Sequence, residues 1–236
     1  MNVDRIASTH KGHATWTFSQ SDLLVWRHYR TFGICAALSA EWIRYHAHDG
    51  SLANVLGGGG VGPLNVGKLK EIALLHKTAS DVPGSQRRES ELCVQMHDVL
   101  SLNASGNKTF FNSRTQQDQT TASAVPAAIQ QGGGAPNIEN DIVAAMQRFN
   151  SCYVRINFGG TAWGTSTGHA VAAWLGQPTY GGAGDALFFD PNYGEYWFEQ
   201  KANFFRFFPV FYRAAYRSFP LYFDQDWEVL PCAKRV

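Results

Sequence analysis

The hydrophobic pattern of this chain changes from a helical period to a period of two at Cys152, and no other feature constrains the fold as strongly. Before this residue, four segments have apolar residues three or four positions apart, as amphipathic helices do: residues 35–48, 68–80, 86–102 and 137–149. After it, five segments have the alternation or the apolar runs of strands: residues 152–158, 168–175, 186–190, 195–198 and 221–230. An aromatic helix with a bend at Pro209 is predicted over residues 201–217. Helices first and an antiparallel sheet second predict the α+β fold class.

A length of 236 residues is enough for one well-cored domain, and a second domain would have to be small, so we expect one. Residues 1–20 are polar and irregular, so we expect a flexible leader there and a domain that spans residues 21–236. Residues 103–136 are rich in Asn, Ser, Thr, Gln and Gly. A loop of this length within a compact domain is uncommon and is usually mobile or functional. We interpret it as a mobile surface insertion.

Charge and hydropathy argue against several classes of partner. The formal net charge is +1 and no run of like charges exceeds two residues, so the sequence predicts neither nucleic-acid binding nor a polybasic membrane anchor. No stretch approaches the roughly 18 apolar residues that a membrane span needs, and residues 1–20 lack the apolar core of a Sec signal peptide. We therefore expect no direct membrane insertion.

The four cysteines lie far apart in the sequence: Cys35, Cys93, Cys152 and Cys232. They have neither the density of a disulfide scaffold nor the C-x-x-C spacing of a zinc site. This pattern is typical of thiols made in a reducing cytosol, and we expect no metal and no cofactor. Cys93 and Cys152 are interpreted as buried packing residues.

One of these cysteines, Cys35, is placed where a thiol ionises readily. Gly33 precedes it, and Ile34, Leu38 and Trp42 form an apolar stripe that predicts a helix beginning at or near Cys35. Unpaired N–H groups and the helix dipole favour an anion at that end. Beside an imidazolium, such a thiol has its pKa lowered from about 8.5 to roughly 3.5–7.5. The alternative is a buried cysteine that packs as a small hydrophobe.

A nucleophilic thiol needs a base and a group that orients the base. Of eight histidines, His169 is singled out because it opens the predicted strand 168–175 and so lies at a sheet end. Asp190 ends the apolar strand 186–190 as the chain turns. If these two strands pair as a hairpin, the start of the first faces the end of the second, and Asp190 comes to lie beside His169. The alternative for Asp190 is an ordinary turn opener in Asp-Pro-Asn.

Three motifs in this order carry a resemblance that spans about residues 28–230. They are Gly33-Ile34-Cys35 with Leu38 and Trp42, Gly168-His169-Ala170-Val171-Ala172, and Phe189-Asp190-Pro191-Asn192-Tyr193-Gly194-Glu195. In these motifs the chain resembles the YopT-type cysteine proteases of clan CA, the papain-like superfamily. That family contains bacterial effectors injected into host cells and domains of larger toxins.

The resemblance implies a papain-like fold, in which a helical half carrying Cys35 packs on a sheet carrying His169 and Asp190. It implies that Cys35 is the nucleophile, His169 the general base and then acid, and Asp190 the group that orients the imidazole. The implied activity is that of a cysteine endopeptidase working through a thioester acyl-enzyme. The implied partner is a protein substrate in a target cell, with a cognate chaperone or immunity protein as a further partner. The implied route is synthesis in a bacterial cytoplasm and export by a specialised, non-Sec system.

Two departures from the family pattern bear on the site. The family has an oxyanion-hole Asn or Gln five or six residues before the cysteine, whereas this chain has Arg30 and Tyr29 there. Both are therefore only provisional oxyanion or substrate-binding residues. The spacing from His169 to Asp190 is also longer, with the excess in residues 179–185.

Two other functions stay open on sequence grounds. The same triad serves a glutamine deamidase or transglutaminase-like toxin, which attacks a side-chain amide through the same thioester. A papain-like binding module that has lost activity is the alternative from a different class, and it is suggested by Tyr29 and Arg30. Glycine-rich matches to nucleotide-binding fingerprints over residues 57–68 lack the required strand before them and the Ser or Thr after Lys68. The aromatic run over residues 204–212 predicts core more than a substrate groove.

Overall fold

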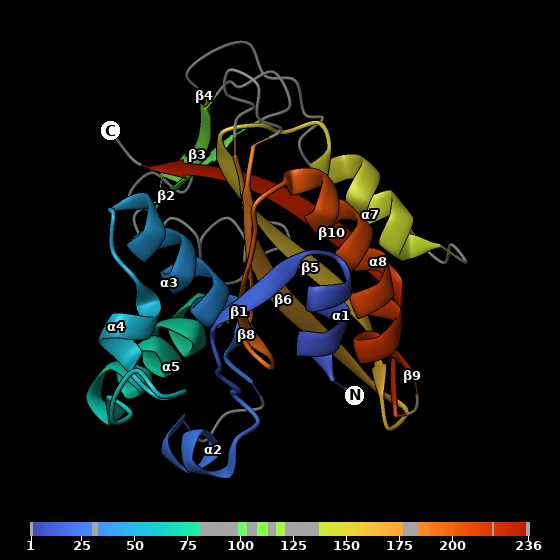
Figure 1. Ribbon diagram of the computed structural model, residues 1–236. Coiled ribbons are helices and arrows are strands. Elements are labelled where there is room, and N and C mark those ends of the chain that lie inside the picture. Colours follow the sequence, from blue (N-terminus) through green and yellow to red (C-terminus); the bar gives the residue numbers. More distant parts are fainter. Residues whose placement is uncertain are drawn as a thin grey trace.

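A computed structural model describes residues 2–29, 33–80, 99–102, 108–112, 117–120, 137–176, 184–218 and 220–234. In it, helices lie on both faces of a curled antiparallel sheet (Figure 1). The predicted α+β fold class is therefore confirmed. No helix in the described parts of the chain is both long enough and apolar enough to cross a membrane.

The helices of the described residues are α1 (Val3–Thr9), α2 (Leu23–Tyr29), α3 (Cys35–Ala47), α4 (Leu52–Leu56), α5 (Val66–Ser80), α7 (Ile138–Met146) and α8 (Lys201–Tyr216). The predicted helices that begin at Cys35, Lys68, Asn137 and Lys201 correspond to α3, α5, α7 and α8, with ends within three residues of those expected. Helix α8 contains Pro209, as predicted.

The strands are β1 (Gly12–Trp16), β2 (Val99–Leu102), β3 (Lys108–Asn112), β4 (Gln117–Thr120), β5 (Cys152–Ala162), β6 (Thr165–Leu175), β7 (Ala186–Asp190), β8 (Gly194–Phe198), β9 (Arg217–Ser218) and β10 (Leu221–Lys234). Their order in the sheet is β1-β8-β7-β6-β5-β10-β2-β3-β4, and β9 pairs with β10. The five predicted strands are confirmed as β5, β6, β7, β8 and β10. The pairs β5–β6, β6–β7 and β7–β8 are antiparallel hairpins of neighbouring strands.

Two expectations for the middle of the chain have mixed outcomes. Most of the helix predicted over residues 86–102 lies outside the described residues, but its end is wrong because Val99–Leu102 is strand β2. Pairing of β2 with β10 overrides the helical spacing there. Strands β3 and β4 lie within the expected insertion, and the rest of residues 103–136, like Cys93, lies outside the described residues.

The flexible leader expected at residues 1–20 is wrong for the described part of that segment. Helix α1 is capped by the Asn2 side chain, which accepts a hydrogen bond of 2.9 Å from the Arg5 N–H, and it buries Val3 and Ala7. Strand β1 then pairs antiparallel with β8. Both elements are short, so their apolar residues are too few to form a readable period in a polar sequence.

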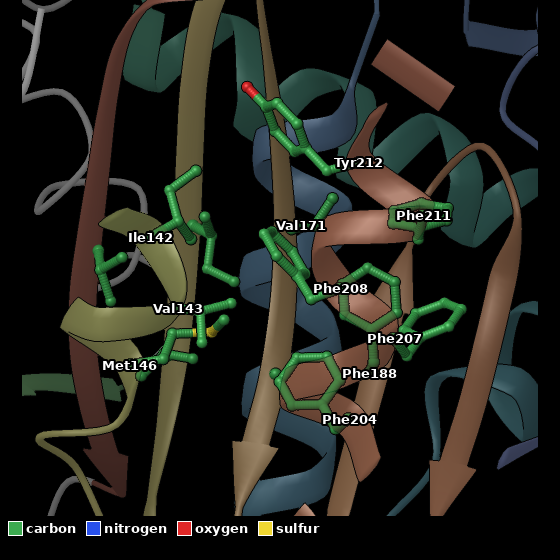
Figure 2. Packing of buried hydrophobic residues seen from close by; sticks show 14 of the residues in the cluster. Ile142, Val143, Met146, Val171, Phe188, Phe204, Phe207, Phe208, Phe211 and Tyr212 are labelled. Atoms are coloured by element: carbon green, nitrogen blue, oxygen red, sulfur yellow. The ribbon is translucent and has the colours of Figure 1, made fainter. Parts of the chain in front are cut away.

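The strands bury side chains on both faces, and the described residues accordingly form two large cores, one on each face. On one face, β6 and β7 contribute Val171 and Phe188 to a core built with α1, α7 and α8 (Figures 1 and 2). Figure 2 shows the aromatic side chains of α8 meeting these strand residues, with Ile142, Val143 and Met146 of α7 nearby. On the other face, Ala172 and Phe189 join a core built with α2, α3, α4 and α5. The period of two within each strand produces this division.

The aromatic run of α8 is core, as predicted. Its fully buried members are Phe204, Phe207, Phe208, Phe211 and Tyr212. Phe188 of β7 packs edge-on against Phe208 and Phe211, with ring centroids 6.0 and 5.3 Å away. Such aromatic pairs add directional contacts to the burial of apolar area.

Candidate active site

Cys35 is the first residue of α3, and the chain before it forces this position. Gly33 has a φ of 129°, a conformation that favours glycine, and Ile34, the residue directly before Cys35, has a fully buried side chain. Leu38 and Trp42, on the same stripe, are also fully buried. The helix is thereby fixed against the sheet while Cys35 itself stays half-buried. Its N–H is among the first four of the helix, which have no partner within it.

Helix α3 is attached to β6 at the level of the cysteine. The Ser39 hydroxyl, one turn along the helix, donates to the carbonyl oxygen of Ala170 at 3.0 Å. The backbone of Ala170 in turn hydrogen-bonds the Cys35 thiol. Ala170 directly follows His169 in the chain, so this attachment brings the thiol to the imidazole.

The hairpin of β6 and β7 places His169 next to Asp190, as the sequence predicts. Ala172 pairs with Phe189 and Leu175 with Ala186, so the end of β7 lies near the start of the buried part of β6. His169 Nε2 is 3.1 Å from Asp190 Oδ1, and the two side chains are 6% and 0% exposed. The longer spacing between these residues falls at the other end of the hairpin, where the Gly176 N–H donates to the Asp185 carbonyl at 2.9 Å.

The imidazole of His169 bridges the thiol and the carboxylate. It hydrogen-bonds Cys35 as well as Asp190. Since Nε2 faces Asp190, Nδ1 is the ring nitrogen that remains for the thiol. The imidazole therefore lies between a thiol and a buried carboxylate, an arrangement in which a base can be oriented by the carboxylate.

The electrostatics of this group favour a thiolate and an imidazolium. Burial by itself would raise the pKa of the Cys35 thiol, but the charge of His169, its hydrogen bond and the backbone of Ala170 lower the pKa below its ordinary value. The buried cation of Arg155 acts in the same direction. Burial would lower the pKa of His169, but the charges of Asp190 and Cys35 raise it to about 10. The two shifts are opposite in sign, as expected of an ion pair.

Gln20 is a site residue that sequence reasoning missed. Its side-chain Oε1 accepts from the Ile34 N–H at 3.1 Å, and its Nε2 donates to Asn192 Oδ1 at 2.9 Å. Its backbone N–H also donates to the Pro191 carbonyl at 2.7 Å. Gln20 is 6% exposed, and its hydrogen bonds connect Ile34, the residue before Cys35, to the turn after Asp190. It lies fifteen positions before Cys35 in a segment that reads as polar leader, so no sequence signal marked it.

Of the two provisional residues upstream of the cysteine, only Tyr29 is described. It is buried, and its hydroxyl donates to the Gln20 carbonyl at 2.9 Å. Burial raises the pKa of Tyr29 to about 12, and the charge of Cys35 acts in the same direction. Arg30 lies outside the described residues.

Glu195, the last residue of the third motif, is a buried carboxylate that attaches α3 to the sheet. Gly194 before it has a φ of 96°, and a Cβ there would lie 2.1 Å from the Trp16 carbonyl oxygen, so only glycine fits. Glu195 then accepts from Trp42 Nε1 at 2.6 Å and lies 3.1 Å from His46 Nε2. Both partners are on the helix that begins at Cys35.

A cavity of about 590 Å³ opens next to this group of residues. Asn192 forms part of its wall, and its apolar lining includes Phe18, Val25 and the exposed Leu24. Gly59 of the glycine-rich loop is also in the wall. The cavity is thus adjacent to the turn that follows Asp190 and is lined mainly by apolar atoms.

The other described cysteines differ from Cys35. Cys152 and Cys232 are buried, free thiols. Burial raises the pKa of Cys152 to about 12 and raises that of Cys232 as well. Cys152 is a packing residue, as expected. Within the described residues, no group of three or more His, Cys, Asp or Glu side chains could hold a metal ion.

Comparisons with known proteins give one family and two distant structures. The family model Peptidase_C58, described as Yersinia/Haemophilus virulence surface antigen, matches residues 4–221. The crystal structure of the Pseudomonas avirulence protein AvrPphB is similar at 13% identity and a TM-score of 0.49, over 88% of this chain and 95% of that one. The YopT domain of the Pasteurella multocida PfhB2 toxin is similar at 17% identity and a TM-score of 0.30, over 88% and 89%. No curated protein sequence matches the chain.

Proposed function

The chain belongs to the Peptidase_C58 family and is a cysteine protease, and we propose that it cleaves a protein of a target cell. In this proposal Cys35 is the nucleophile, His169 is the general base and then acid, and Asp190 is the carboxylate that orients the imidazole. The observation that carries the proposal is the continuous contact from the thiol through the imidazole to the buried carboxylate, with opposite pKa shifts on the thiol and the imidazole. A papain-like fold is part of the proposal. It is supported by the packing of the helix that carries the cysteine against the sheet that carries the other two residues.

The chemistry follows from the protonation states. The Cys35 thiolate attacks the carbonyl carbon of a peptide bond, and the carbonyl electrons move onto the oxygen. The imidazolium of His169 gives its proton to the leaving amine, the tetrahedral intermediate collapses, and a thioester to Cys35 remains. His169, now neutral, takes a proton from water, whose oxygen attacks the thioester and releases the acid. The thiolate and imidazolium are then restored.

The oxyanion that forms on the carbonyl needs donors fixed in advance. The N–H of Cys35 at the start of α3 is the first donor we propose. For the second, Gln20 is favoured over Tyr29. The Gln20 side chain is fixed beside Cys35 by its contact with Ile34, and its amide nitrogen has a second N–H besides the one donated to Asn192, whereas Tyr29 already donates its single proton to the Gln20 carbonyl. We propose that the neighbouring cavity binds part of the substrate chain.

We further propose that the protein acts as a delivered virulence effector. The support is the family itself, which is described by a bacterial virulence antigen. The substrate would then be a protein of the recipient cell, and export would use a specialised system, with a chaperone or immunity protein as a further partner.

Selective labelling tests the triad without knowledge of the substrate. An epoxysuccinyl inhibitor is expected to modify Cys35 and to spare Cys152 and Cys232, because Cys35 alone of these three described cysteines has a lowered pKa. Mass spectrometry of the labelled chain locates the modified thiol. Equal labelling of Cys152, or no labelling of Cys35 in a folded protein, would contradict the proposal.

Substrate capture then tests the reaction. A folded Cys35→Ala protein is added to lysates of a eukaryotic and a bacterial cell, bound proteins are identified, and each is incubated with wild type. A backbone cut made by wild type and absent with Cys35→Ala supports endopeptidase activity. A bound protein that wild type deamidates without cutting would replace this reaction with an amidase, and identical behaviour of the two proteins would leave only a binding function.

A further inference from the structure

Tyr216, the last residue of α8, meets the triad from the opposite face of the sheet to Cys35. Its side chain is 1% exposed. Its hydroxyl oxygen lies 2.6 Å from Asp190 Oδ2 and 3.0 Å from His169 Nε2. Asn192 Nδ2 donates to the same oxygen at 3.3 Å. One buried hydroxyl therefore contacts both the base and its orienting carboxylate.

The direction of these hydrogen bonds follows from the protonation of the phenol. Burial and the charge of Asp190 raise the pKa of Tyr216 well above its ordinary value, so the hydroxyl keeps its proton. Asp190 is the anionic acceptor at the shorter distance, so the proton is donated to its Oδ2. The phenol oxygen then accepts from His169 Nε2–H, which is shared with Asp190 Oδ1. Donating to an anion makes that oxygen a better acceptor.

The ring of Tyr216 also restricts the imidazole. The centroids of Tyr216 and His169 are 5.0 Å apart, and Phe158 lies 5.4 Å from His169 and 5.0 Å from Tyr216. Tyr216 is in turn packed against Phe211 and Phe223, at 5.8 and 5.5 Å. The imidazole is thus held by an aromatic cluster as well as by hydrogen bonds.

We propose that Tyr216 is a fourth member of the catalytic group, a positioning residue whose hydroxyl joins His169 to Asp190 and keeps Nδ1 directed at Cys35. This inference rests on the triad proposed above. Without the hydroxyl, Asp190 Oδ2 loses its donor and Nε2–H loses one of its two acceptors. The buried pair of imidazolium and carboxylate is then less stable, and the thiolate that depends on the imidazolium is less stable too.

Tyr216→Phe removes the hydroxyl and keeps the ring, and α8 offers a matched control. Tyr212 lies one turn earlier, is fully buried, and donates its hydroxyl proton to the Phe223 carbonyl at 2.7 Å. Tyr212→Phe therefore removes a buried hydroxyl from the same helix without removing a contact to the triad. Both variants are compared with wild type by thermal unfolding, which records the common cost of losing a buried hydrogen bond.

The rate at which iodoacetamide alkylates Cys35 is measured as a function of pH, with peptide mass spectrometry as the detection. A residue with a merely structural role would leave the midpoint of this profile unchanged. Among the described residues, the ionisable side chains that act on Cys35 or Asp190, besides the triad and Tyr216, include Tyr29, Arg155, Tyr193 and Tyr196, and all four are kept in both variants. In Tyr216→Phe the midpoint of the profile is expected to rise by about one pH unit, so that the rate on the acid side falls about tenfold. Tyr212→Phe is expected to keep the wild-type midpoint.

Two outcomes would overturn the inference. One is a Tyr216→Phe midpoint equal to that of Tyr212→Phe, and the other is a lower midpoint, which would mean that Tyr216 competes with His169 for Asp190. A wild-type Cys35 that alkylates with the midpoint of an ordinary thiol would instead overturn the triad itself, so the two failures are distinguishable. If Tyr216→Phe does not fold, wild type with isotope-labelled histidine still gives a test by NMR. A slowly exchanging, downfield Nε2 proton on His169 is expected, and rapid exchange with water would contradict the shared buried proton.

Discussion

The two faces of the sheet hold their helices in different ways. On the α8 face, the contact between α8 and the sheet is largely aromatic: Phe188 of the sheet packs against Phe204, Phe207, Phe208 and Phe211. On the α3 face, aliphatic side chains such as Leu38 fill the space, and directional polar contacts attach the helix. The middle of α8 thus contributes area and close packing, and Tyr212 and Tyr216 add hydrogen bonds at the end of α8, whereas the polar contacts of α3 are distributed along the helix.

The polar contacts of α3 are spaced along the helix. Ser39 donates to the Ala170 carbonyl near the first turn, and Trp42 and His46 contact Glu195 further on. Trp42 also stacks on Phe189 with an angle of 8° between the rings. A hydrogen bond fixes direction and distance more narrowly than apolar packing does. We infer that the α8 face mainly supplies stability, with Tyr216 as the one residue proposed to position the imidazole, and that the α3 face supplies the position of the thiol.

Removing the thiol of Cys35, the proposed nucleophile, tests this division most strongly. Cys35→Ala is expected to lower kcat on the order of 10⁶-fold, as loss of a nucleophile does in serine-protease triads. Because Cys35 is half-buried, its loss should leave the thermal midpoint close to that of wild type. Cleavage of a captured substrate and calorimetry measure the two quantities. A large loss of stability would show that the thiol is part of the core, against the division.

Core truncations on the two faces are the next largest test. Phe208→Ala on α8 is expected to cost about 3–5 kcal/mol of unfolding free energy, and Leu38→Ala on α3 about 2–5 kcal/mol, since both side chains are fully buried. Denaturant unfolding measures both. At a temperature where each variant is folded, Leu38→Ala should lower kcat and Phe208→Ala should leave it nearly unchanged. Equal effects on kcat would break the proposed difference between the faces.

Most strands of the sheet could be predicted from the sequence, because their pairing is determined by residues that lie close together in the chain. Strands β6 and β7 are strong period-two segments joined as a hairpin, so their pairing fixes the contact between His169 and Asp190. The start of α3 at Cys35 was also readable, since Gly33 and the apolar stripe are adjacent to it.

The residues that complete the site were not readable, because they reach it from far away in the sequence. Gln20 contacts Asn192 across 172 positions, and Tyr216 contacts His169 across 47. Tyr216 has the spacing of an ordinary core residue of α8, and Gln20 lies in a polar segment. Neither pattern indicates which distant residue the side chain will contact in the folded protein. The contacts arise only when β1 pairs with β8 and α8 packs on the sheet.

Gln20 provides the third test, on the connection between the two halves of the site. Gln20→Ala is expected to lower kcat about 10²–10³-fold, the usual cost of losing an oxyanion donor. Tyr29→Phe, which removes the hydroxyl that bonds the Gln20 carbonyl, should cost much less. Kinetics on a captured substrate decide between them. If Tyr29→Phe is the more damaging change, the phenol and not the amide stabilises the oxyanion.

Substitution of Glu195 is expected to have the smallest effect. It tests whether the attachment of α3 to the sheet matters for catalysis separately from the stability of the protein. Hydrogen bonds from Thr15 and Trp42 and the nearby His46 lower the pKa of Glu195 despite the opposing effect of burial. A carboxyl with a lowered folded-state pKa adds stability above its unfolded pKa, and this stability is lost as pH falls through the folded value. Glu195→Gln should therefore cost about 1–3 kcal/mol at pH 7, with the difference from wild type shrinking below the ordinary pKa of 4.5.

The matched control for Glu195→Gln is Glu41→Gln. Glu41 is a buried carboxylate of α3 that pairs with Arg44 and Lys68, at 2.9 and 3.2 Å, on the helical side of the molecule. Both variants should lose stability in urea titrations run across the acidic range. Only Glu195→Gln should also lower kcat and raise the midpoint of Cys35 alkylation, because only Glu195 joins α3 to the strand that follows Asp190. If Glu41→Gln lowers kcat equally, the position of the thiol depends on the overall stability of α3 and not on its attachment to the sheet.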